Sequence, residues 1–128
     1  MNVSDYISNC IAEREISHVF GMSGANIEDL YQSIIQLGKT KIILAKSEYN
    51  AATMAIGSYI ATKNISLVLT TSGPGILNTL PVLAEAFTCN IPLVLISGLI
   101  PSHFEGIGGF QDTSGKNGTF NLLEITKH

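Results

Sequence analysis

The sequence predicts an α/β domain with a three-layer α/β/α arrangement, in which a parallel central sheet lies between two layers of helices. Apolar segments of strand length alternate along the chain with longer segments that have helical periodicity. The apolar segments are continuous instead of alternating with polar residues, which is typical of parallel strands covered on both faces. At 128 residues the chain has the length of a single domain.

The N-terminal part of the chain predicts a helix, a strand and a second helix. Apolar side chains within residues 3–11 have the spacing of one helix face. Residues 19–20 form a short apolar strand that ends in the turn residues 21–24. Asn26 is then expected to cap a helix, and Gly38 is the expected stop of that helix.

Three more strands are expected after this point. Residues 41–45 and 66–71 predict buried strands, and an Ala-rich helix connects them. A further helix runs to about Cys89, with Pro81 either in its first turn or at a kink. An apolar strand over residues 92–97 completes the alternation.

Residues 98–121 differ in character from the rest of the chain. They form a Gly-rich segment that carries Phe110 and Gln111. So long a loop in a compact domain is usually functional or mobile. An apolar pattern resumes at residues 122–125, but no stop of the fold is recognisable after it. We therefore expect the domain to be incomplete at its C-terminus.

The composition argues against several classes of function. The net charge is −3 and no cluster of Lys or Arg is present, which disfavours nucleic acid or an anionic membrane as a partner. No apolar run has the length of a membrane span, and we expect no signal peptide. Cys10 and Cys89 form no metal or redox motif and are expected to be buried free thiols, which favours a cytoplasmic location.

A ligand pocket is expected beyond the carboxyl ends of the strands, where doubly wound sheets bind their ligands. The loops that leave those ends span residues 21–25, 46–50, 70–75 and 97–112. All but the second carry glycines, which let the backbone approach a ligand closely. The second carries the carboxylate of Glu48 at the start of a helix. These features predict a pocket without defining a reaction.

Each of these features also has an ordinary structural explanation. Glu48 alone is more often a first-turn acid that stabilises its helix, and residues 72–75 alone are a generic turn. No phosphate-binding loop is present. A metal site is not predicted, because His103 has no Cys or His neighbours. A hydrolase is disfavoured, because no serine has a Gly-x-Ser-x-Gly context.

The order and spacing of several segments resemble the motifs of one enzyme family. Residues 19–24, VFGMSG, resemble V-F-G-x-P-G, and residues 46–52, KSEYNAA, resemble R-H-E-x-x-A-A. Residues 57–61, GSYIA, resemble a following G-Y-A segment. The segment TTSGPG at residues 70–75, followed by Asn78, resembles T-S-G-P-G-x-x-N.

The resemblance continues toward the C-terminus. Residues 91–98, IPLVLISG, resemble I-P-L-V-x-I-x-G, and residues 109–112, GFQD, resemble A-F-Q-E. Residues 125–128, ITKH, resemble a later T-K segment. Each motif is weak alone. The ordered set, from about residue 4 to residue 128, resembles the pyrimidine-binding (PYR) domain of acetolactate synthase-like enzymes that use thiamine diphosphate (ThDP).

The resemblance implies a role for each matching position. In that family a glutamate hydrogen-bonds a ring nitrogen of the aminopyrimidine of ThDP and so promotes formation of the reactive ylide. Glu48 matches this glutamate and is implied to be catalytic and to bind the cofactor. The other implied cofactor-binding residues are Gly24, Ala25, Ser72, Gly73, Pro74, Gly75 and Asn78. Phe110 and Gln111 are implied to face the substrate, a 2-oxo acid such as pyruvate.

The chain also departs from the family pattern. Ser47 stands where many members have His, and Tyr49 replaces a common Gln. Ser23 replaces Pro, and Ala25 replaces a common second Gly. Because Glu48 is kept, the resemblance implies ThDP chemistry more strongly than it implies acetolactate as the product.

A larger departure is the lack of a diphosphate-binding domain. The family binds the diphosphate and magnesium in a second domain through a G-D-G…N motif, and no G-D-G occurs in residues 1–128. We therefore expect residues 1–128 to form a PYR domain that holds only the pyrimidine end of ThDP and is inactive alone. Its expected partner is a diphosphate-binding domain of the same or another chain, in a homo-oligomer (a dimer or a tetramer). The interface would account for a charged content of only 13%.

Alternatives remain open. The chain is either a fragment of a longer enzyme or the PYR-only subunit of a split enzyme such as sulfopyruvate decarboxylase. A non-catalytic binding or assembly module, in the form of a degenerate paralogue, is a further alternative, favoured by Ser47 in place of His and by the missing second domain. A Rossmann-type nucleotide domain is disfavoured, because the Gly-rich fingerprint is missing after Phe20.

Overall fold

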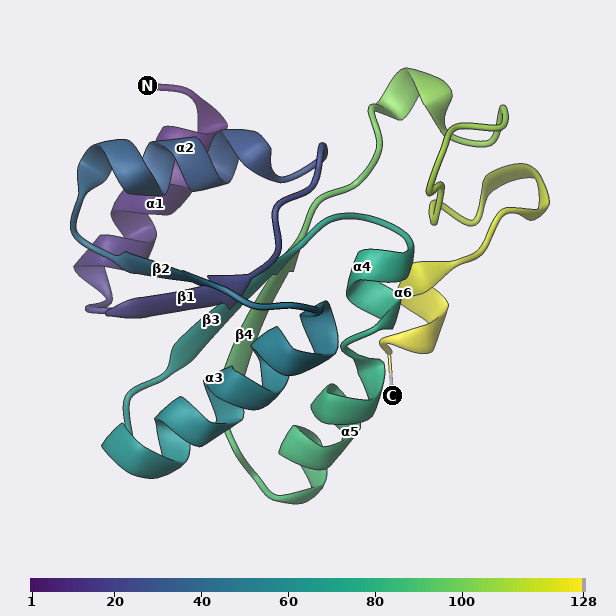
Figure 1. The fold of residues 1–128 in the computed structure, drawn as a ribbon. Helices are drawn as coiled ribbons and strands as arrows, with labels where there is room; N and C mark the ends of the chain where they lie inside the picture. Colours follow the sequence, from purple (N-terminus) through teal and green to yellow (C-terminus); the bar gives the residue numbers. More distant parts are fainter. Residues whose placement is uncertain (128) are drawn as a thin grey trace.

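The computed structural model describes residues 1–127, and His128, the last residue of the predicted ITKH segment, lies outside the described residues. Four parallel strands form one sheet in the order β2-β1-β3-β4, with helices on both faces (Figure 1). The predicted α/β class is therefore confirmed. In chain order the elements are α1 Val3–Glu13, β1 His18–Gly21, α2 Glu28–Leu37, β2 Lys41–Leu44, α3 Glu48–Thr62, β3 Ser66–Thr70, α4 Pro74–Leu77, α5 Leu80–Thr88, β4 Leu93–Ser97 and α6 Leu122–Ile125.

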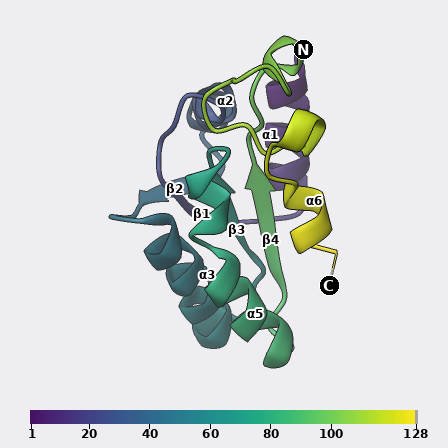
Figure 2. The same cartoon turned by 90° about the vertical axis from the view of Figure 1, so that its right-hand side faces the viewer.

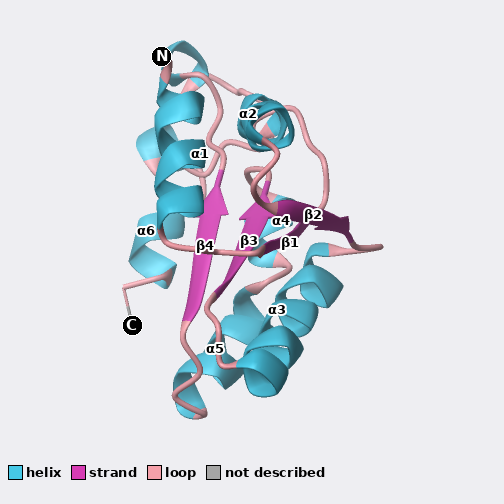
Figure 3. Cartoon of the chain, turned by 90° about the vertical axis from the view of Figure 1, so that its left-hand side faces the viewer, coloured by secondary structure: helices cyan, strands magenta, loops and turns pink. Residues whose placement is uncertain are grey.

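Each face of the sheet carries its own apolar core. The faces alternate along β3, where Leu67 and Leu69 pack toward α1 and α2 while Val68 packs toward α3 and α5. Figure 3 shows the strands between these two helical layers. All three β3 side chains are fully buried, which explains why this strand is apolar at every position. On the second face, Ala51 and Ala55 have no exposed surface, so the Ala-rich α3 lies close against the sheet.

Local sequence sets the helix ends near the site. Ser47 caps α3, because its hydroxyl oxygen accepts a hydrogen bond from the backbone N–H of Asn50 at 3.2 Å. This cap fixes Glu48 as the first residue of the helix. The predicted stop at Gly38 is confirmed, since Gly38 is the left-handed C-cap of α2. Pro81 lies in the first turn of α5, which is one of the two expected arrangements.

Several expectations about individual residues are wrong. Asn26 does not cap α2: the helix begins one residue after Ile27, and no side chain caps it. The cysteines are not buried, because Cys10 is half-buried and Cys89 is exposed at the end of α5. Residues 41–45 are not a buried strand, because β2 is an edge strand and Leu44 is 64% exposed.

Residues 98–121 leave the end of β4 and fold beside the sheet, before α6 (Figure 2). This segment contains two short 3-10 turns, at Ser102–Phe104 and Lys116–Gly118, and a single bridge between Ser114 and Asn121. It is therefore ordered by turns and side chains instead of by a strand or a long helix. Among residues 1–127, no helix is both long enough and apolar enough to cross a membrane.

Candidate functional site

The candidate site lies at the carboxyl edge of the sheet. The register pairs Gly21 with Leu44 and Thr70 with Ser97, so the ends of these parallel strands lie along one edge. Every site residue predicted from the sequence follows one of these strand ends within eight residues or belongs to the segment 98–121. The predicted placement of the pocket therefore has a structural basis in the register.

The first group of site residues surrounds the carboxylate of Glu48. This half-buried side chain accepts a hydrogen bond through Oε2 from Nδ2 of Asn78, at 3.1 Å. Its other oxygen, Oε1, lies 3.6 Å from the place that a Cβ would occupy on Gly75. The structure thus brings Glu48 together with Gly75 and Asn78, which lie far from it in the sequence, and it leaves Oε1 without a protein hydrogen-bond partner among the described residues.

Burial and the charge of Glu48 also affect the pKa of a tyrosine, Tyr31. Burial, and then the nearby charge of Glu48, raise the pKa of Tyr31 to about 12. The Tyr31 hydroxyl stays protonated at neutral pH and donates to the backbone oxygen of Leu69 at 3.4 Å. Tyr31 was not predicted to belong to the site, because a position on the apolar face of α2 gives no sign of a polar contact.

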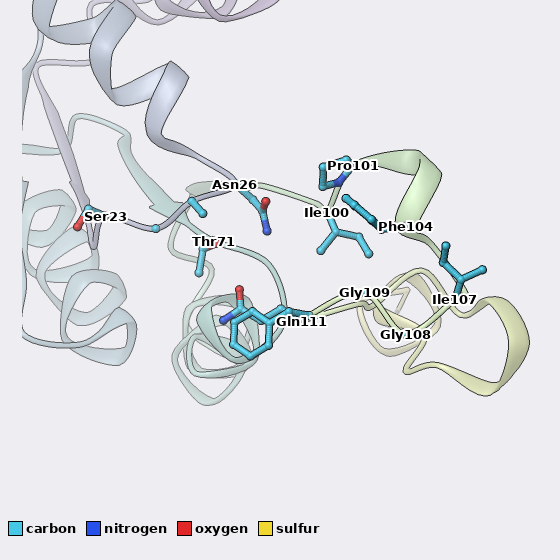
Figure 4. A pocket seen from close by; sticks show the side chains of 13 residues that line it. Ser23, Asn26, Thr71, Ile100, Pro101, Phe104, Ile107, Gly108, Gly109 and Gln111 are labelled. Atoms are coloured by element: carbon cyan, nitrogen blue, oxygen red, sulfur yellow. The ribbon is translucent and has the colours of Figure 1, made fainter.

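The second group of site residues lines a cavity of about 740 Å³. Four predicted residues line it: Gly24, Ala25, Phe110 and Gln111. The other lining residues were not singled out, but all except Asn26 lie in the loops 21–25, 70–75 and 97–112 that were expected to form the pocket: Ser23, Asn26, Thr71, Ile100, Pro101, Phe104, Ile107, Gly108 and Gly109. In Figure 4 the side chains of Asn26, Thr71 and Gln111 lie toward one end of the cavity, and the labelled apolar side chains lie toward the other, namely Ile100, Pro101, Phe104 and Ile107.

Thr71 lies between the two groups. A Cβ added to Gly24 would lie 2.6 Å from Thr71 Cβ, and one added to Gly75 would lie 2.8 Å from Thr71 Cγ2. The backbone on both sides of Thr71 therefore approaches it more closely than any other residue type would allow. The Thr71 hydroxyl is buried and has no hydrogen-bond partner in the structure. Buried polar groups without partners are rare in native proteins, and among the described residues the hydroxyls of Ser8, Thr70 and Thr113 share this property.

The remaining predicted residues form the turn after β3. Ser72 is fully buried, Gly73 adopts a left-handed conformation with φ +62°, and Pro74 is the exposed first residue of α4. The Ser72 hydroxyl accepts a hydrogen bond from Nδ2 of Asn26 at 2.7 Å. The turn therefore connects the cavity wall to the helix that carries Asn78. Among residues 1–127, no group of three or more His, Cys, Asp or Glu side chains is arranged to hold a metal ion.

Comparison with known proteins identifies the family. Residues 1–118 match the family described as thiamine pyrophosphate enzyme, N-terminal TPP binding domain. The chain belongs to this family. It is 34% identical over 109 residues to the acetolactate synthase large subunit of Buchnera aphidicola (subsp. Schizaphis graminum), and 33% identical over 109 residues to that of Haemophilus influenzae. It is also 34% identical over 102 residues to the mitochondrial acetolactate synthase catalytic subunit of Saccharomyces cerevisiae.

These matches cover most of this chain and a small part of each relative. The two bacterial matches include 85% of this chain and 19% of the relative, and the yeast match includes 80% and 15%. The chain therefore spans about a fifth of the length of the curated relatives that it matches, and it corresponds to a thiamine-diphosphate-binding N-terminal domain.

Proposed function

We propose that this chain is the pyrimidine-binding part of a ThDP-dependent 2-oxo acid decarboxylase or carboligase of the acetolactate synthase type. The observation that carries the proposal is the carboxylate of Glu48 at the start of α3, with Oε2 bound by Asn78 and Oε1, near Gly75, without a hydrogen-bond partner among the described residues. Membership of the TPP-binding family and the names of the relatives support the cofactor and the reaction type.

In this proposal Glu48 holds a proton at the pyrimidine end of the cofactor. Bound ThDP supplies an electron sink for cleavage of the carbon–carbon bond next to a carbonyl group. The bond from Asn78 fixes one carboxyl oxygen of Glu48, so the other oxygen is free to share a proton with a ring nitrogen. The start of a helix is a fitting position, because the backbone N–H groups there stabilise the carboxylate when the proton has moved to the ring.

The residues around Glu48 fit the pyrimidine. A Cβ on Gly75 would lie 3.6 Å from Oε1 and 2.8 Å from Thr71 Cγ2, so a larger residue would crowd this side of the carboxylate, and the Thr71 hydroxyl lacks a hydrogen-bond partner in the same region. We assign cofactor binding to the backbone and side chains of Gly24, Ala25, Ser72, Gly73, Pro74, Gly75 and Asn78, together with Glu48. We assign the substrate side to Phe110 and Gln111, which line the cavity on the other side of Thr71.

The proposal requires a second domain. A diphosphate-binding domain, on the same or another chain, would supply the magnesium site and complete the active site in a homo-oligomer. Residues 1–128 form the PYR domain in this arrangement and are inactive alone. Exposed apolar side chains on α3 and α5 support such a partner: Tyr49 is 50% exposed, Ile60 is 56% exposed and Phe87 is 79% exposed.

A non-catalytic assembly module is the second candidate. Ser47 replaces the His of many relatives, and its hydroxyl oxygen accepts the capping hydrogen bond from Asn50, which is a structural role. On this alternative the domain would bind its partner but not ThDP. The carboxylate of Glu48 would then serve only as a first-turn acid of α3.

Substitution of Glu48 separates these roles. The chain is combined with a diphosphate-binding domain, and ThDP-dependent consumption of pyruvate is measured for Glu48→Gln and for Glu28→Gln. Both residues are first-turn acids, of α3 and α2, so both variants lose the same helix-terminus stabilisation. We expect Glu48→Gln to lower the rate at least ~10²-fold, because proton transfer at the ring is lost. Glu28→Gln should leave the rate unchanged, and full activity of Glu48→Gln would refute the assigned role.

A further inference from the structure

A chain of side chains connects three loops at the polar end of the cavity. Nδ2 of Asn26, in the loop after β1, donates to Oγ of Ser72 at 2.7 Å. The Ser72 hydroxyl, in the turn after β3, donates in turn to Oε1 of Gln111 at 3.5 Å. Gln111 belongs to the segment after β4. Ser72 has no exposed surface, so its hydroxyl hydrogen-bonds these protein groups instead of solvent.

Two glycines make this arrangement sterically possible. A Cβ on Gly98 would lie 2.0 Å from the backbone oxygen of Asn26, a distance that no side chain permits. A Cβ on Gly73 would lie 2.7 Å from Cβ of Gln111. The outer members of the chain, Asn26 and Gln111, are therefore both held against glycine backbone from a neighbouring loop.

Gln111 has an unfavourable backbone conformation. Its φ is +63°, in the left-handed region that glutamine rarely adopts. Such a conformation persists only where the surrounding structure enforces it, and it is concentrated at functional sites. Gln111 combines this conformation with the hydrogen bond from Ser72 and the close approach of Gly73.

The direction of the hydrogen bonds determines how the Gln111 side chain is turned. Because Ser72 accepts from the amide of Asn26, its single proton is available for Gln111. Gln111 must then offer its oxygen to Ser72, and its NH₂ group is left as a donor. We propose that Asn26 and Ser72 are positioning residues that orient the carboxamide of Gln111, so that its NH₂ group serves the cavity as a hydrogen-bond donor.

This orientation selects the chemistry of the ligand. A side-chain NH₂ group binds acceptors, such as the carboxylate or carbonyl oxygen of a 2-oxo acid, and does not bind a group that can only donate. The choice of a 2-oxo acid rests on the proposed function, whereas the orientation of Gln111 rests only on the Asn26–Ser72–Gln111 chain. Figure 4 shows Asn26 and Gln111 at the same end of the cavity, beside Thr71.

The proposal is tested on the chain itself by hydrogen–deuterium exchange of the backbone amides in residues 102–115. Ser72→Ala removes both hydrogen bonds, and Asn26→Asp replaces the donor by a carboxylate that would take the Ser72 proton away from Gln111. Both variants remove the Ser72–Gln111 bond, the one of the two that reaches this segment, and should therefore raise its exchange about fivefold, the factor expected for loss of one hydrogen bond. Asn26→Ala should raise it less, because Ser72 can still donate to Gln111.

A matched control comes from α1. Asn9→Ala removes a comparable side-chain hydrogen bond, from Nδ2 to the backbone oxygen of Asp5 at 2.9 Å, and should not change exchange in residues 102–115. Because a general loss of stability would affect both ends of the molecule, exchange in α1 is recorded for every variant. The proposal is overturned if Ser72→Ala leaves exchange in residues 102–115 at the wild-type rate. It is also overturned if Asn26→Asp and Asn26→Ala raise that exchange equally.

The same variants separate this proposal from the proposed function. No step of the exchange experiment requires ThDP, a 2-oxo acid or a partner domain. A chain that fails to bind ThDP in a complex but shows the expected exchange pattern would refute the proposed function and retain the orientation of Gln111. The reverse pattern would refute the orientation and retain the function.

Discussion

The carboxylate of Glu48 and the cavity wall around Gln111 are close together but are held by different kinds of structure. Glu48 and Asn78 lie at the ends of helices, and their positions follow from the cap at Ser47 and the turn after β3. Gln111 lies in a segment held by turns, side-chain hydrogen bonds and glycine contacts. The group assigned to proton transfer is therefore on regular structure, whereas the substrate-facing wall depends on a few polar contacts.

A carboxylate organises the segment that carries Gln111. Asp112 accepts hydrogen bonds from the backbone N–H groups of Gly106, at 2.6 Å, and Ser114, at 2.8 Å. The side chain of Asn117 adds a bond to the backbone oxygen of Gly106 at 2.9 Å. Few apolar contacts support this segment, since Ile107 is 70% exposed and Phe110 is 86% exposed. It should consequently open at a lower free energy than the sheet and its helices do.

The largest expected effect comes from a pair of glycine substitutions. Gly98→Ala places a Cβ 2.0 Å from the backbone of Asn26, so it should lower the free energy of unfolding by roughly 1–3 kcal/mol through forced backbone shifts. Gly57→Ala, inside α3, meets no atom within 4 Å and should raise it by about 0.5–1 kcal/mol through helix propensity. Chemical denaturation of both variants measures these values. If Gly98→Ala leaves the free energy of unfolding unchanged, the backbone of Gly98 does not lie tightly against that of Asn26.

A smaller effect is expected from acid. Hydrogen bonds from the backbone of Gly106, and then of Ser114, hold the pKa of Asp112 below its ordinary value of 3.8. A carboxylate with a lowered folded-state pKa stabilises the fold above its ordinary pKa, and this contribution is lost as the pH falls through the folded-state value. Amide protection at Gly106 and Ser114 should therefore decrease on acidification below about pH 4, while protection in β3 persists.

One variant and one comparison check the cause of this acid effect. Asp112→Asn should remove the pH dependence at Gly106 and Ser114, and unchanged pH dependence in that variant would contradict the explanation. Asp5 offers a comparison in the helical layer, where the backbone N–H of Asn2, and then the hydroxyl of Ser33, lower the pKa of Asp5. Its protonation should reduce protection in the first turn of α1 and leave residues 102–115 unaffected.

The features predicted correctly from the sequence are those that local rules determine. The continuous apolar pattern of β3 predicted its burial, and the position of Glu48 at a helix start followed from the residues around it. Asn26 shows where local rules fail. Asparagine is a common helix cap, but this side chain bonds to Ser72, which is 46 positions away in the sequence. No pattern within a single segment contains that contact.

The strand order explains a second group of errors. The apolar residues 41–45 predicted a buried strand, yet β2 lies at the edge of the sheet and exposes Leu44. The sequence pattern records which residues are apolar but not which strand lies outermost. The sequence likewise predicted which loops form the pocket but not which of their residues line it, because Ile100 and Thr71 come to one cavity only when the ends of β3 and β4 lie side by side.

Calorimetry of ThDP binding tests the central claim most directly. The chain is mixed with a diphosphate-binding domain in the presence of magnesium, assembly is confirmed by mass measurement, and ThDP is then titrated into the wild-type and Glu48→Gln complexes. We predict a saturable binding isotherm for the wild type and a weaker one for Glu48→Gln, because the ring nitrogen loses its carboxyl partner. A complex that assembles but gives no heat of ThDP binding would contradict the proposed function and favour an assembly module.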